Sequence, residues 1–332
     1  MKKGTGRKIT VTIGLLAIIA MFSAISANAA DVSEILSNIM RPDWEAEAQS
    51  LNAAKDLFAQ ALPVVIVLGV ILGLLRGRSA RKKPMVPVIA NGKVKRHPFS
   101  ILFEHWTHTI GCIMCIITAV FLLLGTRFGW LKTFSPFLMA YKLHFIGAGI
   151  LVFASLFYIV NHIIAGDREI LPVISDFKDS IAETMAIMGV IGDGAFFGIR
   201  GLYLPEKLKR PLANLLAKIG VKEPPHAGKW LPIERVETPA WAILVGAIIL
   251  TGIVKTLRYT RELSPTLVHI ATKLHLIVAI LILLLLIVHI LTAAVIPPSW
   301  PLFKSMLTTK ASEEYVKEHH PEWYEKLRRE GK

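Results

Sequence analysis

The sequence predicts an all-α integral membrane protein, in which a bundle of four transmembrane helices follows one extra N-terminal transmembrane helix. The 332 residues are 53% hydrophobic with a mean hydropathy of +0.54, which is far from the composition of a soluble domain. After residue 56 the chain holds five apolar runs, each close to the roughly 20 residues that cross a bilayer. Lysine and arginine residues cluster beside these runs, as they do in membrane proteins.

Charge and cysteine content exclude other classes of protein. The formal net charge of +14 would suit a nucleic-acid-binding protein, but the basic residues crowd into loops beside apolar runs. That distribution is typical of the positive-inside bias of membrane proteins. Two cysteines exclude a disulfide framework and any four-cysteine iron–sulfur cluster of this chain's own.

Residues 1–29 are expected to be a secretory signal peptide. A basic start precedes the apolar run 11–22, and Ala27-Asn28-Ala29 supplies a small-x-small cleavage site. Cleavage there would place the mature N-terminus outside the cytoplasm. An uncleaved anchor helix is the alternative, although the apolar run is short for a span.

The first transmembrane helix is expected at 57–75, after an acidic extracytoplasmic segment at 30–56. A basic loop follows at 76–99, and no acidic residue interrupts it. Such a block is the strongest cytoplasmic marker in this chain, so the first span runs from outside to inside. Its eight basic residues are Arg76, Arg78, Arg81, Lys82, Lys83, Lys93, Lys95 and Arg96.

The four-helix domain is expected at 100–296, and a polar cytoplasmic tail at 297–332. A cytoplasmic loop at 165–238 divides the four spans into pairs, and its apolar patches predict helices on the membrane surface. The topology places the chain in a bacterial-type inner membrane with its C-terminus in the cytoplasm. The spans are predicted at roughly 100–124, 141–164, 239–257 and 268–296.

Two histidines in the last span point to a cofactor. His275 and His289 lie fourteen residues apart, which is within about 40° of four full helical turns and rises roughly 21 Å. Both imidazoles therefore project from one face of the helix, near opposite sides of the bilayer. Ionisable groups inside a membrane are costly and usually functional, and histidine is a common axial ligand of haem iron. The alternative is that the two histidines reach separately toward opposite interfaces or hydrogen-bond within the bundle.

The predicted topology sorts four histidines into two pairs by depth. His105 lies early in the second span and His289 late in the fifth, both near the cytoplasmic face. His144 and His275 both lie near the outer face. This arrangement predicts two b-type haems, with the outer iron held by His144 and His275 and the inner iron by His105 and His289. The four-helix bundle is thus predicted to bind haem.

The tripeptide Lys-Leu-His occurs at both histidines of the predicted outer site. Lys142 precedes His144 by two residues, and Lys273 stands in the same relation to His275. Both lysines can pair with anionic haem propionates. Anchoring of the helix ends by extended lysine side chains is the alternative.

Other histidines compete for these roles. His108 lies one turn from His105 and is an alternative ligand, because residues three apart share a helix face. His162 shares the face of His144 five turns further on. His97 is expected at the interface, and His319 and His320 are expected to be solvated in the polar tail.

Cys112 and Cys115 form a Cys-x-x-Cys motif within the second span. No histidine follows Cys115, so the pattern for covalent c-type haem attachment fails. Small residues that pack a helix interface are the favoured interpretation over redox chemistry.

These residues resemble the dihaem cytochrome b (gamma) subunit of respiratory formate dehydrogenase, whose relatives serve membrane hydrogenases and thiosulfate reductases. The resemblance covers roughly residues 95–328. Its matching pieces are His105-Trp106, His144, the His275-x13-His289 spacing and the tail Glu318-His319-His320-Pro321-Glu322-Trp323-Tyr324. The signal segment and the first span lie outside it.

The resemblance implies His105 rather than His108 as the ligand, together with the pairing given above. It also implies a quinone site near the cytoplasmic haem, helped by a stretch that corresponds here to His226-Ala227-Gly228-Lys229. Gly228 fits the family pattern, whereas His226 and Lys229 depart from it, which leaves the quinone contacts and the type of quinone open. Since the pKa of histidine lies near neutrality, His226 is a candidate proton donor to the quinone.

The resulting hypothesis is a path for electrons across the membrane, from an extracytoplasmic partner through both haems to a quinone. The resemblance implies an iron–sulfur subunit and an extracytoplasmic catalytic subunit as partners. One rival is a quinol-oxidising cytochrome b that passes electrons outward to a multihaem cytochrome c. Another is a cytochrome b subunit of a hydrogenase or thiosulfate reductase. A haem-free transporter with histidine proton relays is a rival from a different class, although the parallel Lys-Leu-His repeat does not fit inverted repeats.

Overall fold

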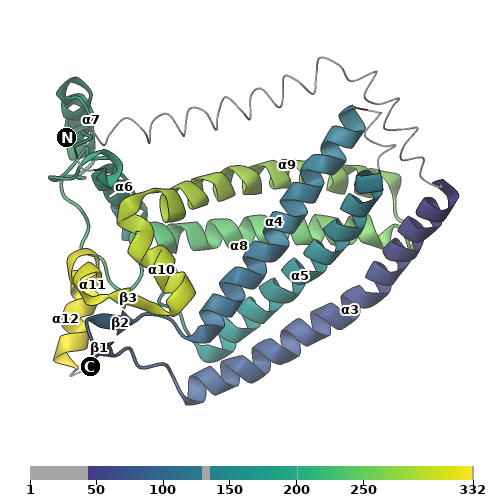
Figure 1. Ribbon diagram of the computed structural model, residues 1–332, viewed down its shortest axis with the longest axis horizontal. Helices are drawn as coiled ribbons and strands as arrows, with labels where there is room; N and C mark the ends of the chain where they lie inside the picture. Colours follow the sequence, from purple (N-terminus) through teal and green to yellow (C-terminus); the bar gives the residue numbers. More distant parts are fainter. Residues whose placement is uncertain (1–43, 129–134, 200, 331–332) are drawn as a thin grey trace, which may run out of the picture. The chain divides into compact units, whose positions relative to one another are not determined.

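The computed structural model describes residues 44–128, 135–199 and 201–330 (Figure 1). The expected signal peptide and residues 30–43 lie outside this range. The chain divides into two compact units. The smaller unit contains Ile117–His144 and the residues up to Ala54, and the larger contains Lys55–Ile116 and Phe145–Lys332.

Five helices in the described part of the chain are long and apolar enough to cross a membrane, which confirms the predicted all-α membrane fold. An apolar helix satisfies its backbone hydrogen bonds internally, as the absence of water in a bilayer core requires. These helices are α3 (Trp44–Lys82), α4 (Phe99–Arg127), α5 (Ser135–Ala165), α8 (Pro232–Leu257) and α9 (Pro265–Ile290).

Several helix boundaries differ from the hydropathy-based prediction: α3 begins at Trp44 and ends at Lys82 instead of spanning 57–75, and α5 begins at Ser135 instead of residue 141. Helix α8 begins seven residues before the expected Pro239, because Glu234 stabilises its N-terminus: one carboxylate oxygen accepts a hydrogen bond from the Leu231 N–H at 2.8 Å. Helix α9 continues as a π-helical turn, Leu291–Val295, and ends where the short 3₁₀ turn Pro297–Ser299 begins.

Small residues bring α3 against α5. Gly69, Gly73 and Gly77 recur every four residues on α3 and face α5. A Cβ atom on Gly73 would lie 2.9 Å from the carbonyl oxygen of Phe157 and 2.9 Å from Cβ of Val160. The glycines therefore allow the two backbones to approach closely, which drives association of helices inside membranes.

The pairs α4–α5 and α8–α9 complete the packing in the larger unit. A Cβ on Gly111 of α4 would lie 3.0 Å from the backbone nitrogen of Leu151, and one on Gly147 of α5 would lie 3.0 Å from Sγ of Cys115. Cys115 therefore packs at the α4–α5 interface. Helices α8 and α9 run side by side along their length (Figure 1).

The segment between α5 and α8 forms its own small core. It contains α6 (Ile174–Ile187), a 3₁₀ turn (Phe196–Gly198) and α7 (Glu206–Lys218), and α6 packs against α8. Ile174 and Phe177 remain exposed on α6, as do Leu208 and Leu215 on α7. These apolar faces fit the expected surface helices, whose location at the membrane stays a prediction. The core consists of Ala182, Val190, Ile191, Leu216 and Val221.

The C-terminal tail folds back on the start of α4. Strands β1 (Ile89–Ala90), β2 (Lys93–Lys95) and β3 (Lys310–Ser312) form an antiparallel sheet in the order β1-β2-β3. Helices α10 (Trp300–Thr308), α11 (Glu313–His319) and α12 (Pro321–Arg329) belong to the same region. We refer to the sheet with α11 and α12 as the tail cap. Its core consists of Val94, Ala311, Val316, Trp323 and Leu327.

Burial in the tail cap overturns one expectation. The expected solvation of His320 was wrong, because its side chain is fully buried. The side chain of His97 is fully buried as well, and its expected position at the membrane interface stays a prediction. His319 remains 40% exposed. A hydropathy pattern describes the tail as polar because it cannot detect the pairing of Val94 with Ala311, more than 200 residues apart.

Candidate functional site

His105 of α4 and His289 of α9 face each other in the larger unit. Their ring centroids lie 6.3 Å apart, and the ring planes are inclined by 49°. Bonds between imidazole nitrogens and a metal are about 2 Å long in zinc sites, so two rings on opposite sides of one metal have centroids roughly 6 Å apart. The pair therefore fits the axial ligation of one haem iron.

The second ring nitrogen of His289 contacts a carboxylate. Nδ1 of His289 lies 3.3 Å from Oε2 of Glu237 on α8. The ring also meets Trp241 edge to face, with centroids 6.0 Å apart. Because an ionised carboxylate only accepts hydrogen bonds, it favours the tautomer with the proton on Nδ1 and the lone pair on Nε2.

His275 is oriented by a threonine. Its Nδ1 lies 2.9 Å from Oγ1 of Thr251 on α8, and that hydroxyl donates its proton to the carbonyl oxygen of Ala247 at 2.8 Å. The hydroxyl oxygen is then the acceptor and Nδ1–H of His275 the donor, so the lone pair of this ring is on Nε2 as well. A Cβ on Gly252 would lie 3.4 Å from Cε1 of the same ring, so the glycine leaves room for the imidazole.

His144 has the same kind of partner within the smaller unit. Its Nδ1 lies 2.9 Å from Oγ1 of Thr118 on α4. His144 and His275 belong to different units, and their pairing at an outer haem stays a prediction. The role of Lys142 and Lys273 toward haem propionates also stays a prediction.

The two competing histidines contact other groups. His108 places Nδ1 2.9 Å from the Glu104 carbonyl oxygen and Nε2 3.1 Å from Oγ of Ser155 on α5. His162 lies 3.5 Å from the Glu104 carboxylate. Of the two candidates on α4, His105 is therefore the one that faces His289.

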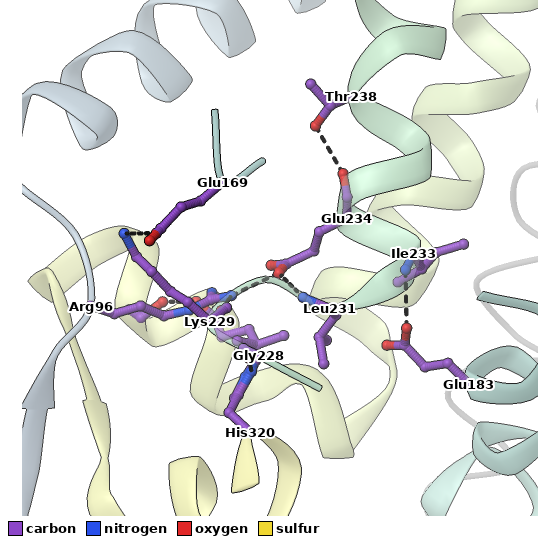
Figure 2. Close-up of polar contacts among 12 residues, drawn as sticks. Arg96, Glu169, Glu183, Gly228, Lys229, Leu231, Ile233, Glu234, Thr238 and His320 are labelled. Atoms are coloured by element: carbon purple, nitrogen blue, oxygen red, sulfur yellow. Dashed lines mark hydrogen bonds and ion pairs between the residues drawn. The ribbon is translucent and has the colours of Figure 1, made fainter. Parts of the chain in front are cut away.

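The start of α8 carries a buried cluster of charged groups (Figure 2). Arg96 is 1% exposed, and its guanidinium donates to Glu234 at 2.7 Å and to the Lys229 carbonyl oxygen at 3.0 Å. His97 and Arg96 both pack against the Trp230 ring. Burial, followed by the nearby Arg96 and Lys229 charges, lowers the pKa of His97 from 6.5 to about 2.

The residues of the stretch proposed for quinone contacts, 226–229, have different surroundings in the structure. The side chain of His226 is exposed, whereas the Gly228 carbonyl oxygen accepts a 2.7 Å hydrogen bond from Nδ1 of His320 in the tail cap. Lys229 forms a 3.7 Å ion pair with Glu169. Burial is the largest cause that lowers the pKa of His320 from 6.5 to about 4, and Arg96 adds to it.

The sequence pattern does not identify Glu237, Thr118 or Thr251 as partners of the candidate ligands. A signal was present, because each is a polar residue within or beside an apolar span. Which histidine each contacts depends on helix packing. Glu237 and His289 are 52 residues apart in sequence.

The chain matches a model of a known protein family. The model of the prokaryotic cytochrome b561 family matches residues 96–309, which contain all four candidate ligands. No curated protein and no solved structure matches the chain. The match covers well over half of the sequence, so the chain belongs to the prokaryotic cytochrome b561 family and is a membrane b-type cytochrome of electron transfer.

Proposed function

We propose that this chain is the membrane dihaem cytochrome b subunit of a respiratory dehydrogenase, similar to the gamma subunit of formate dehydrogenase. In this function it carries electrons from an extracytoplasmic partner, through two b haems, to a quinone near the cytoplasmic side. The observation that carries the proposal is the facing pair His105 and His289, at a separation that suits one bis-histidine haem. The haems, when bound, supply one-electron redox chemistry.

The chain's own residues orient the ligands. Glu237, Thr251 and Thr118 each contact Nδ1 of one proposed ligand, and the contacts of Glu237 and Thr251 favour the tautomer with its lone pair on Nε2. His105 and His289 hold the inner iron in this proposal, and His144 and His275 hold the outer iron. The basic loop 76–99 supports a cytoplasmic location for the inner pair.

The buried cluster at the start of α8 supports a quinone site at the same end of the bundle. Reduction of a quinone takes two electrons and two protons, so polar groups must reach the headgroup from the aqueous side. Gly228 contacts the buried ring of His320 and Lys229 that of Trp230, whereas the exposed His226 would act as a proton donor from the surface. Partner subunits, an iron–sulfur protein and an extracytoplasmic catalytic protein, would supply the electrons.

Stopped-flow reoxidation tests this function. The purified, chemically reduced protein is mixed with a short-chain naphthoquinone or ubiquinone, and the haem absorbance is followed. We expect rapid reoxidation in the wild type, strong slowing in His289→Ala, and wild-type behaviour in the control Glu206→Gln, an exposed position on α7. Failure of both quinones to reoxidise the wild-type haems would contradict the proposal. Faster reduction by a quinol than reoxidation by a quinone would favour the outward-directed rival.

A further inference from the structure

Glu237 is an acidic residue inside a span, and its contact is a candidate haem ligand. Its carboxylate is 19% exposed and lies 3.3 Å from Nδ1 of His289. A carboxylate in a membrane helix is costly and is retained where it has a partner or a function. Helix capping does not explain it, because Glu234 serves that role.

The neighbouring arginines form ion pairs with carboxylates other than that of Glu237. Arg96 pairs with Glu234 at 2.7 Å, and Arg235 lies 3.3 Å from Asp176 while it donates to the Leu171 carbonyl oxygen at 2.7 Å. Within the described residues, the Glu237 carboxylate makes its polar contact with Nδ1 of His289. The carboxylate is therefore placed to act on the imidazole.

Uncharged groups contact Nδ1 of two other candidate ligands. Thr251 contacts Nδ1 of His275 and Thr118 contacts Nδ1 of His144, both through hydroxyl groups. A carboxylate acceptor makes a stronger, charge-assisted hydrogen bond than a hydroxyl does. It draws the Nδ1 proton away from the ring, which makes Nε2 a better electron donor.

We propose that Glu237 is a positioning residue that fixes the ring of His289 and lowers the midpoint potential of the inner haem relative to a neutral acceptor. A more strongly donating axial ligand stabilises the ferric state over the ferrous state, and hydrogen bonding around the ligands is one of the means by which a protein sets haem potential. The inference rests on the proposed ligation of the inner haem by His289.

The charge difference gives the two sites different properties. A carboxylate at the inner site makes electron transfer from the inner haem to a quinone more favourable. It makes electron transfer from the outer haem to the inner haem less favourable. Thr118 and Thr251, which contact Nδ1 of His144 and His275, carry no charge that would produce this effect at the proposed outer haem. Glu237 thus adjusts the final transfer step without touching the quinone.

A redox titration of the complete purified protein tests the inference. Optical spectra resolve the haem components, and His289→Ala identifies the inner component as the one that disappears. In Glu237→Gln we expect two haems per chain, a raised midpoint potential for the inner component, an unchanged outer component and an altered low-spin ferric EPR signal from the inner haem. The matched control Glu206→Gln removes an exposed carboxylate and leaves both potentials unchanged.

The outcomes separate this inference from the proposed function. Two haems with unchanged potentials and an unchanged EPR signal in Glu237→Gln would overturn the inference alone. Full haem content in His289→Ala would overturn the proposed ligation. If Glu237→Gln loses the inner haem, Glu237→Asp must regain it, because the carboxylate is restored. Equal loss in both variants would count against a role for the charge.

Discussion

Arg96 and Glu234 form a 2.7 Å ion pair that joins the segment before α4 to the first turn of α8, and the arginine is 1% exposed. Removal of one partner from a buried pair leaves an uncompensated charge and typically costs about 3–5 kcal/mol. We expect Glu234→Ala to lower the free energy of unfolding by about 3 kcal/mol, measured by denaturant unfolding in detergent. The control Glu206→Ala breaks the exposed pair with Arg210, for which about 0.3–0.5 kcal/mol is expected. Equal losses in the two variants would contradict this assignment.

The buried histidines predict loss of stability in acid. The pKa of His320 is about 4 and that of His97 about 2 in the folded protein, against 6.5 for both when unfolded. Their contribution is complete above pH 6.5 and is lost as the pH falls from 6.5 toward these values, because the unfolded chain then binds more protons. Each pH unit in this range lowers the free energy of unfolding by about 1.4 kcal/mol per histidine.

We therefore expect proteolysis of the tail cap to accelerate between pH 7 and pH 5. In His320→Asn the amide keeps a donor for the Gly228 carbonyl oxygen but does not titrate, so the acceleration should be smaller. An equal acceleration in the wild type and the variant would show that His320 does not cause it.

The glycine contacts between α3 and α5 predict a steric effect. A leucine at position 73 would collide with Phe157 and Val160, and overpacking of this kind costs typically 1–3 kcal/mol. We expect Gly73→Leu to lower the thermal midpoint of the detergent-solubilised protein. Gly246→Leu is the matched control, because a Cβ on Gly246 of α8 meets no atom within 4 Å. A lowered midpoint in the control alone would contradict the α3–α5 packing.

His105 and His108 differ in what they face, and this predicts different haem contents. His105 faces His289, whereas both ring nitrogens of His108 are engaged by Glu104 and Ser155. We expect His105→Ala to lose one haem per chain and His108→Ala to retain both, as counted by the pyridine haemochrome method. The reverse result would assign the ligand to His108.

Hydropathy predicted the five spans because a helix that crosses lipid must be apolar along most of its length. It placed the start of α8 too late, because the first turns of this helix contain the charged residues Glu234, Arg235 and Glu237 and are nevertheless helical, stabilised by the Glu234 cap. Matching of histidines by depth predicted the pair His105 and His289, since topology fixes depth along each span. The ring spacing itself required the structure.

The sequence pattern could not predict contacts between residues that are far apart in the chain. The pairing of Val94 with Ala311 and the bond from His320 to Gly228 join distant segments, so the polar composition of the tail suggested solvation instead. The glycine repeat on α3 was a readable signal, because small residues every four positions are typical of helix interfaces in membranes. The pairing of His144 with His275 stays a prediction.

Haem stoichiometry tests the central claim most directly. The complete chain is purified, and its b-type haem is counted per chain for the wild type and for His105→Ala, His144→Ala, His275→Ala and His289→Ala. We predict two haems in the wild type and one in each single variant. His105→Ala and His289→Ala should lose the same redox component, and His144→Ala and His275→Ala the other. A wild-type protein without b-type haem, or full haem content in the variants, would contradict the account.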